Sequence, residues 1–171
     1  MGLTLNLIEL LLLAVKQKTG AYELPSTRNK EVNMIYEDNF KLLKKLGVIS
    51  SDGIPREYSK SKSPSFMDLV IERNTILDKI NGKDCIGFSM AHYFLQNGDL
   101  CSDPLMEVLV YPDLKMVEAF SFDMSIPPLY QVVYDGESCD FRLKESLNDF
   151  LNQWLKNLGM QGFGEVWSEE N

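Results

Sequence analysis

Histidine and paired cysteines are scarce in this sequence. His92 is the only histidine, and the three cysteines, at positions 85, 101 and 139, form no Cys-x-x-Cys pair. Zinc sites and disulfide frameworks need several such residues at regular spacing, so the sequence indicates neither, and we expect no cofactor. Isolated cysteines of this kind are typical of small buried side chains in a reducing compartment, which predicts a cytoplasmic protein.

Two catalytic motifs are also missing. No serine or cysteine lies in a Gly-x-Ser-x-Gly elbow, and no lysine follows a Gly-x-x-x-x-Gly phosphate loop. Serine hydrolases and nucleotide kinases depend on these local geometries. The sequence therefore does not support either class of enzyme.

Basic residues are outnumbered by acidic ones, 17 to 25, which gives a formal net charge of −8 at pH 7. We expect no direct nucleic-acid binding, because proteins of that class neutralise phosphates with clustered Lys and Arg. The imbalance is local: residues 1–65 carry a net charge of +3 and residues 66–171 a net charge of −11. With 171 residues, 44% of them hydrophobic, the chain has the size and composition of one globular domain.

Long hydrophobic runs are missing as well. The one apolar stretch that suggests a membrane, residues 3–15, contains Asn6 and Glu9 and has only 13 residues. It is too short to span a bilayer and lacks the basic flank of an export signal, so we expect no membrane association. Residues 3–18 are instead predicted to form a helix that is apolar on almost every side. Such a helix must be covered, either by its own domain or by a second copy of the chain in a homodimer.

The hydrophobic pattern of the rest predicts an α+β fold. A second helix is expected over residues 30–46 with Gly47 at its end, followed by a loop at residues 50–65, where large apolar residues are almost missing. The apolar period then falls to two. This predicts strands at residues 66–73, 84–96, 105–111 and 115–122, and a shorter extended piece at 129–134. Turn signals separate these strands at Asn81-Gly82, Asn97-Gly98 and Pro112-Asp113.

The C-terminal helix is the clearest element, because apolar residues between 143 and 158 keep a helical spacing without a miss. We expect Asp140 to cap its start and Gly159 to end it. The predicted fold is a single domain: an antiparallel β-meander of four to five strands, covered by this helix and preceded by two N-terminal helices. Along the chain we expect a helical part at residues 1–49, a loop at 50–65, the sheet at 66–136, the C-terminal helix at 140–159 and a tail at 160–171. In the tail, Phe163 and Trp167 are expected to tuck into a groove of their own domain.

The densest polar cluster is the segment HYFLQNGDLCSD, from His92 to Asp103. If Asp99 and Asp103 converge, with Glu107 or His92 nearby, they could hold a divalent cation for phosphodiester hydrolysis. The same residues also suit a turn, because Asn, Gly and Asp favour positive φ and local hydrogen bonds. His92 is either a general base or a hydrogen-bonded histidine of the core.

An acidic stretch follows, from Gly98 to Asp140, with nine carboxylates and a single Lys115. It is either a solvated face or an array of charges that imitates phosphates and occupies a basic channel of another protein. Its members Asp113, Glu118 and Asp123, together with the preceding cluster, are the candidate binding residues. The complete set is His92, Gln96, Asn97, Asp99, Asp103, Asp113, Glu118 and Asp123.

The segment AHYFLQNGDLCSDPLMEV resembles a family of domains of unknown function carried by bacterial mobile elements and phages, with the motif H-Y-x-x-Q-N-G-D-L-x-x-D-P-x-M. The flanking segments PSFMDLVIE and LNDFLNQWLKNLGMQGF are similar to that family too, so the resemblance covers roughly residues 64–163. The order of YEDNFKLLKKL, the strands and FLNQWL is more faintly similar to the YqiB-like proteins, also of unknown function. The resemblance implies a genomic setting rather than an activity.

Three functions remain open on these grounds. The leading hypothesis is a non-enzymatic protein of a phage or mobile element that inhibits a host defence or DNA-processing protein through its acidic surface. The second is a metal-dependent nuclease or phosphoesterase that uses the carboxylates of the polar cluster. The third is a structural subunit that dimerises through the first helix.

Overall fold

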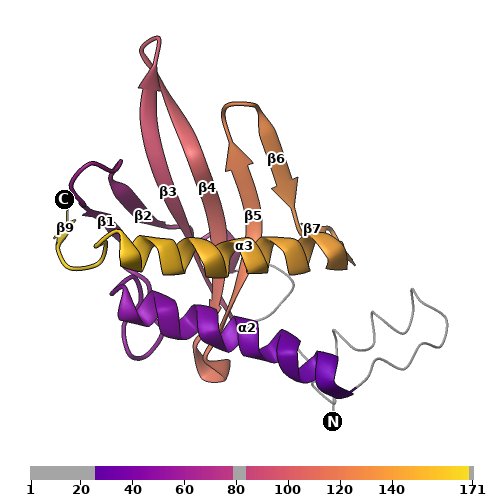
Figure 1. Cartoon of the computed structure of the whole chain (residues 1–171). Coiled ribbons are helices and arrows are strands. Elements are labelled where there is room, and N and C mark those ends of the chain that lie inside the picture. Colours follow the sequence, from indigo (N-terminus) through magenta and orange to yellow (C-terminus); the bar gives the residue numbers. More distant parts are fainter. Residues whose placement is uncertain (1–25, 79–83, 170–171) are drawn as a thin grey trace. The chain divides into compact units, whose positions relative to one another are not determined.

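A computed structural model describes residues 26–78 and 84–169 of the chain (Figure 1). The chain divides into two compact units, residues 1–32 and residues 33–171. Of the first unit the structure describes only residues 26–32, which begin helix α2 (Ser26–Lys45). The predicted helix at residues 3–18, its homodimer contact and the turn at Asn81 and Gly82 therefore lie outside the described residues.

The second unit is built on a seven-stranded antiparallel sheet with the strand order β6-β5-β4-β3-β2-β1-β9. The strands are β1 (Tyr58–Ser61), β2 (Leu69–Arg73), β3 (Ile86–Gln96), β4 (Asp99–Tyr111), β5 (Met116–Met124), β6 (Leu129–Val132) and β9 (Trp167–Glu169). A short 3-10 helix, η2 (Pro112–Leu114), joins β4 to β5. A separate hairpin of β7 (Tyr134–Asp135) and β8 (Ser138–Cys139) leads into helix α3 (Phe141–Met160). The α+β class and the central meander are confirmed, but among the described residues the sheet has seven strands rather than four or five.

Strands β1 and β9 extend the sheet beyond the predicted meander. They lie in segments expected to be a loop and a tail, and they pair with each other, Ser61 opposite Trp167. Their sequences, YSKS and WSE, lack the alternation of apolar and polar residues that indicates a strand. Long-range contacts hold β9 in place: the Trp167 indole donates to the backbone oxygen of Leu46 at 3.2 Å, and the Arg56 guanidinium lies 4.7 Å from the indole centroid.

Strands β3 and β4 form one long hairpin, so β4 begins at Asp99 and not, as predicted, at residue 105. Gln96 pairs with Asp99 across a two-residue turn of Asn97 and Gly98, whose φ angles are 53° and 89°. Positive φ at both central residues is typical of a type I′ turn, which matches the twist of the flanking strands. The turn predicted at Asn97-Gly98 is therefore confirmed, and the polar residues after it belong to β4.

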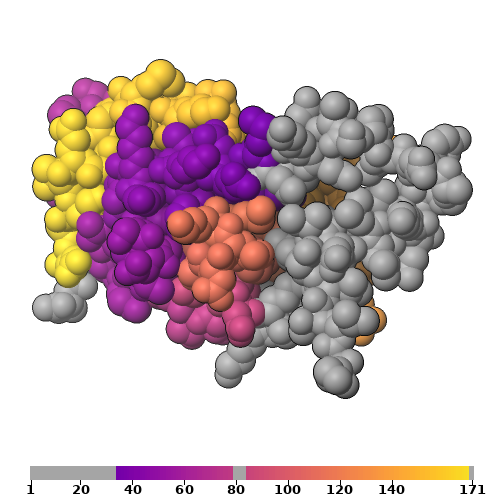
Figure 2. Space-filling model, turned by 90° about the horizontal axis from the view of Figure 1, so that it is seen from below, coloured from indigo at the N-terminus to yellow at the C-terminus, as the bar shows by residue number. Residues whose placement is uncertain are grey.

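Helix α3 and the part of α2 from residue 33 onward lie side by side on one face of the sheet (Figures 1 and 2). Leu43 of α2 and Leu155 of α3 are buried almost completely in the shared core. Helix α2 ends as predicted at Gly47 (φ 69°), with Val48 N–H donating to Leu43 O at 3.0 Å. None of the helices that the structure describes is long and apolar enough to cross a membrane.

The two ends of α3 depend on different residues. Asp140 caps its start as predicted, because one carboxylate oxygen accepts from the backbone N–H groups of Arg142 and Leu143. The predicted stop at Gly159 is wrong: the helix continues through that glycine and ends around Gly162 (φ 83°). There Phe163 N–H donates to Leu158 O at 3.1 Å, which completes the terminal turn.

The core lies between the two helices and the covered face of the sheet. Its largest fully buried members include Phe88, Leu43, Leu69, Ile71, Met90, Met106, Leu151, Leu155 and Leu158. Phe163 of the tail is buried in it and Trp167 packs against it, which confirms that these aromatics tuck into their own domain.

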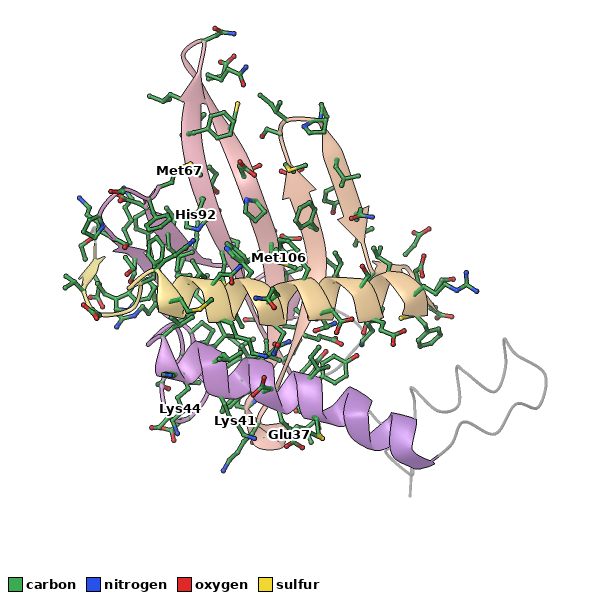
Figure 3. The ribbon with its side chains drawn as sticks, in the orientation of Figure 1. Glu37, Lys41, Lys44, Met67, His92 and Met106 are labelled. Atoms are coloured by element: carbon green, nitrogen blue, oxygen red, sulfur yellow. The ribbon has the colours of Figure 1, made fainter. Side chains whose placement is uncertain are left out.

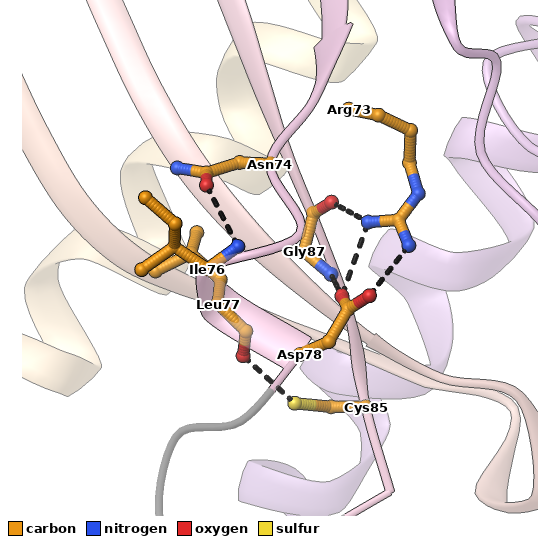
Figure 4. Close-up of polar contacts among 7 residues, drawn as sticks. All are labelled: Arg73, Asn74, Ile76, Leu77, Asp78, Cys85 and Gly87. Atoms are coloured by element: carbon orange, nitrogen blue, oxygen red, sulfur yellow. Dashed lines mark hydrogen bonds and ion pairs between the residues drawn. The ribbon is translucent and has the colours of Figure 1, made fainter.

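The connection after β2 is fastened to β3 by an ion pair (Figure 4). Arg73 Nη2 lies 2.7 Å from Asp78 Oδ2, and the other carboxylate oxygen accepts from Gly87 N–H at 2.7 Å. The hydrogen bonds from Arg73 are the main reason that the pKa of Asp78 is lowered. A side chain at Gly87 would place its Cβ 2.2 Å from Leu77 Cβ, so the segment reaches this position only because residue 87 is glycine.

Candidate binding surface

His92 is held in the packing between the sheet and α3 (Figure 3). Its side chain is 8% exposed, and its Nδ1 lies 3.1 Å from the backbone oxygen of Asp68. The imidazole centroid lies 5.7 Å from the Trp154 ring and 5.5 Å from the Phe163 ring. Burial lowers the pKa of His92 below its ordinary value, because the charged imidazolium loses hydration. These contacts favour a histidine of the core over a general base.

The predicted polar cluster is spread along the β3–β4 hairpin. Gln96, Asn97 and Asp99 are exposed at the tip, where their types suit the turn. Asp103 is exposed on β4, where the register with β3 shifts between Ala91 and Tyr93. The structure thus gives these side chains access to a partner but does not gather them around a point.

The carboxylates of the metal hypothesis are not brought together either. His92 faces the helices, whereas Glu107 lies on the opposite face of the sheet, where it accepts from Asn74 Nδ2 at 2.9 Å and from Ser121 Oγ at 2.7 Å. Asp99 is at the hairpin tip. Within residues 26–78 and 84–169, no group of three or more His, Cys, Asp or Glu side chains is arranged to hold a metal ion.

The three acidic candidates occupy three different environments. Asp113 is exposed in η2, and Asp123 is half-buried on β5, where it accepts from Ser102 Oγ at 3.1 Å. Glu118 is only 2% exposed. The expectation that Glu118 belongs to an exposed acidic face is therefore wrong, because this carboxylate is enclosed with a lysine of α3.

Glu118 and Lys144 form a buried ion pair, with both side chains 2% exposed. Tyr111 donates to the carboxylate at 2.7 Å and Tyr134 at 3.0 Å, and the Lys144 ammonium lies 5.6 Å from the ring centroid of Tyr36. Burial, and after it the negative charge of Glu118, raises the pKa of all three tyrosines, Tyr36, Tyr111 and Tyr134, well above the ordinary value. With every charged group paired, this network joins β5 to α3 and offers no free group to a ligand.

The face of the sheet turned away from α2 and α3, called the open face, carries a different set of polar groups. One row across it contains Val70, Ala91, Leu105, Asp123 and Tyr130, each paired in register with the next. The neighbouring row includes Glu72 and Glu107, and Tyr93 follows two residues beyond Ala91. The tyrosine–acid patch is defined as Tyr93, Tyr130, Glu72, Glu107 and Asp123.

The members of this patch lie close enough to act on one another electrostatically. Partial burial, then the negative charges of Glu107 and Asp123, raises the pKa of Tyr130. Burial and the charges of Glu72 and Asp123 likewise raise the pKa of Tyr93. Tyr130 remains 65% exposed, so its ring and the adjacent carboxylates are accessible from outside.

Large apolar side chains are exposed beside the patch. Leu95 and Leu100 face each other across the β3–β4 hairpin and are 75% and 67% exposed. They share the open face with Tyr93, because side chains two residues apart on a strand point the same way. Figure 1 shows that the hairpin tip projects well beyond α3.

The family model that describes a domain of unknown function, DUF6908, matches residues 38–164. The chain belongs to the DUF6908 family. The matched region contains the C-terminal part of α2, the whole of α3, the buried Glu118–Lys144 pair and the whole tyrosine–acid patch, and it ends before β9. No match to a curated protein or to a solved structure was found.

Sequence reasoning missed three residues of the DUF6908 region that the geometry makes prominent: Lys144, Tyr93 and Tyr130. Lys144 and Asn148 fall on the helical positions that continue the buried stripe of Leu151 and Leu155, so a lysine in an apolar stripe was a readable signal. The tyrosines carry a weaker signal. Only the strand register places Tyr130 directly opposite Asp123.

Proposed function

We propose that the protein is a non-enzymatic protein-binding module that recognises its partner through the open face of the sheet and the tip of the β3–β4 hairpin. The observation that carries this proposal is the exposure of Leu95 (75%), Leu100 (67%) and Tyr130 (65%) on one face. Neighbouring apolar side chains of this size in solvent are typical of a surface that a partner covers. Tyrosine is also enriched at the centres of protein interfaces.

The charge of the surface supports a basic partner. Glu72, Glu107 and Asp123 lie between and beside the tyrosines, in a chain of net charge −8. Complementary charge speeds association and excludes acidic competitors. A protein whose own ligand is nucleic acid presents such a basic surface, so the patch would compete with phosphates for it.

The biological setting that we propose follows from the central motif rather than from the geometry. Its resemblance to proteins of phages and mobile elements makes a cytoplasmic accessory protein that inhibits a host defence or DNA-processing protein the leading assignment. The nuclease alternative has less support, because Asp99, Asp103, Glu107 and His92 are dispersed over two faces and a hairpin tip. A homodimer through the first helix is a separate proposal that concerns residues outside the described part.

The test is capture of partners by the immobilised full chain, with bound proteins identified by mass spectrometry. The double variant Leu95→Ser/Leu100→Ser removes the apolar tip, and Met160→Ser, 78% exposed at the end of α3, is the matched control. We expect the double variant to lose the captured proteins and the control to keep them, with capture by the parent falling as salt rises. Equal capture by all three proteins at every salt concentration would refute the proposal.

A further inference from the structure

Strand β6 forms one outer edge of the seven-stranded sheet. Within the part of the chain that the structure describes, no strand pairs with its outer side. The four residues of β6, LYQV, include no charged side chain, and its pairing with β5 has no bulge. Natural edge strands are protected from further pairing by being very short or by a charge, a proline or a bulge. Strand β6 is short but has none of the other three protections, so its outer side can accept another strand.

The backbone geometry identifies which groups face outward. Val133 N–H donates to Phe120 O at 3.0 Å across the β5–β6 pair. Because hydrogen-bonding direction alternates along an antiparallel strand, Gln131 also faces β5, and the N–H and C=O groups of Tyr130 and Val132 face the outer edge. These four groups are the donors and acceptors that an added strand would use.

The side chains beside this edge indicate what an added strand should carry. Tyr130 and Val132 point to the open face, since they pair with Asp123 and Ser121. By the same alternation Asp123 and Tyr130 form a non-hydrogen-bonded pair, the type in which opposite side chains lie closest. A cationic side chain next to Tyr130 would therefore meet both the face of a phenol ring and the carboxylates of the tyrosine–acid patch.

We infer that the β6 edge docks an extended basic segment of the partner, which adds to the sheet as a further strand and places Arg or Lys side chains against Tyr130 and Asp123. The inference rests on the proposed function and names the chemistry and mode of that binding. A second copy of this chain fits the edge less well, because its β6 carries no cation and each chain has a net charge of −8.

The probe is a blocked ten-residue peptide of alternating Arg and Val, fluorescently labelled and titrated into the full chain by anisotropy. Its control has the same side chains but is N-methylated at alternate residues, so it keeps the charge and cannot complete a strand ladder. We expect the parent peptide to bind and the N-methylated one to bind at least about tenfold more weakly, as expected when two or more backbone hydrogen bonds are lost. Amide hydrogen exchange at Tyr130 and Val132 should slow when the parent peptide is bound.

Protein variants separate the backbone from the charge. Val132→Pro removes an outward N–H and no bond to β5, so it should weaken the peptide about tenfold while the circular dichroism spectrum is retained. Asp123→Asn should weaken it several-fold and flatten its salt dependence, whereas Asp113→Asn, the same change in the exposed η2 turn, should leave it within about twofold.

Four outcomes would overturn the inference. These are no binding of the parent peptide, equal binding of the N-methylated peptide, unchanged hydrogen exchange at Tyr130 and Val132, and a dimer seen by sedimentation that the Val132→Pro change abolishes. The last would assign the edge to a second copy. If partner capture depends on Leu95 and Leu100 but not on Val132→Pro, the proposed function stands and only the β6 docking mode fails.

Discussion

Removing one partner of the buried Glu118–Lys144 pair should destabilise the protein more than removing both. Both side chains are 2% exposed, and the nearest polar groups are the hydroxyls of Tyr111 and Tyr134. In Lys144→Met the carboxylate keeps only these neutral donors. In Glu118→Gln the ammonium keeps Tyr134 and the ring of Tyr36. Each single variant leaves a charge without its counter-ion in a site that water does not reach.

The magnitudes follow from that burial. Leaving one charge of a buried pair unpaired typically costs about 3–5 kcal/mol, and we expect this loss for each single variant. The double variant Glu118→Gln/Lys144→Met has no net buried charge, and its amide still accepts from both tyrosines. Uncharged replacements of a buried pair are often nearly neutral, so the double variant should lose less than either single one, with a coupling free energy of at least about 2 kcal/mol.

Urea unfolding measures these differences through the fluorescence of the chain's two tryptophans. Glu169→Gln is the control, because it breaks the exposed Arg56–Glu169 pair, whose side chains are 29% and 72% exposed. An exposed pair of this kind contributes at most about 1 kcal/mol. The reasoning is refuted if the single variants lose no more than this control, or if the double variant loses the sum of the two single losses.

Three further predictions concern stability. Folding lowers the pKa of His92 from its ordinary value of 6.5, so the unfolded chain takes up the proton first as pH falls, and the free energy of unfolding should decrease below pH ~6.5. His92→Gln should remove that part of the pH dependence when it is compared with the parent by urea unfolding between pH ~7.5 and ~5. Identical pH profiles of the two proteins would contradict the burial argument. Gly87→Ala should cost about 1–3 kcal/mol, because the new Cβ would clash with Leu77. Gly159→Ala lies inside helix α3 and its new Cβ would meet only Leu46 Cδ2, at an ordinary contact distance of 3.9 Å, so it should stabilise the protein by about 0.5–1 kcal/mol in the same assay. Trp154→Ala should cost about 3–5 kcal/mol in a denaturant titration, and a loss of a few tenths would mean that α3 contributes little to the core.

Local chemistry decided the features of this protein that depend on a few neighbouring residues. The stripe of apolar residues in α3, the cap at Asp140 and the end of α2 at Gly47 are all where the sequence predicts them. Asn97-Gly98 makes the turn for the same reason, because residues that accept positive φ act within the turn itself. Signals of this kind depend only on residues that lie close together in the sequence.

Part of the candidate surface was also readable from the sequence. Asp123 and the tip residues Gln96, Asn97 and Asp99 are accessible, as a binding role requires. Tyr130 was not readable, because a tyrosine in a short extended piece belongs to a binding face only once the register sets it opposite Asp123. Register depends on the whole sheet.

Tertiary structure alone decided the environment of charged and polar residues that meet partners far along the chain. Glu118 looks like one more member of an acidic surface until Lys144, Tyr111 and Tyr134 enclose it. The residues of the polar strands β1 and β9 do not themselves favour a strand. The pair is held in place because the Trp167 indole donates to the backbone oxygen of Leu46 and packs against the Arg56 guanidinium. The physical reason is that propensity and periodicity act over a few residues, whereas burial and pairing of polar groups are set by contacts between segments that only the folded chain brings together.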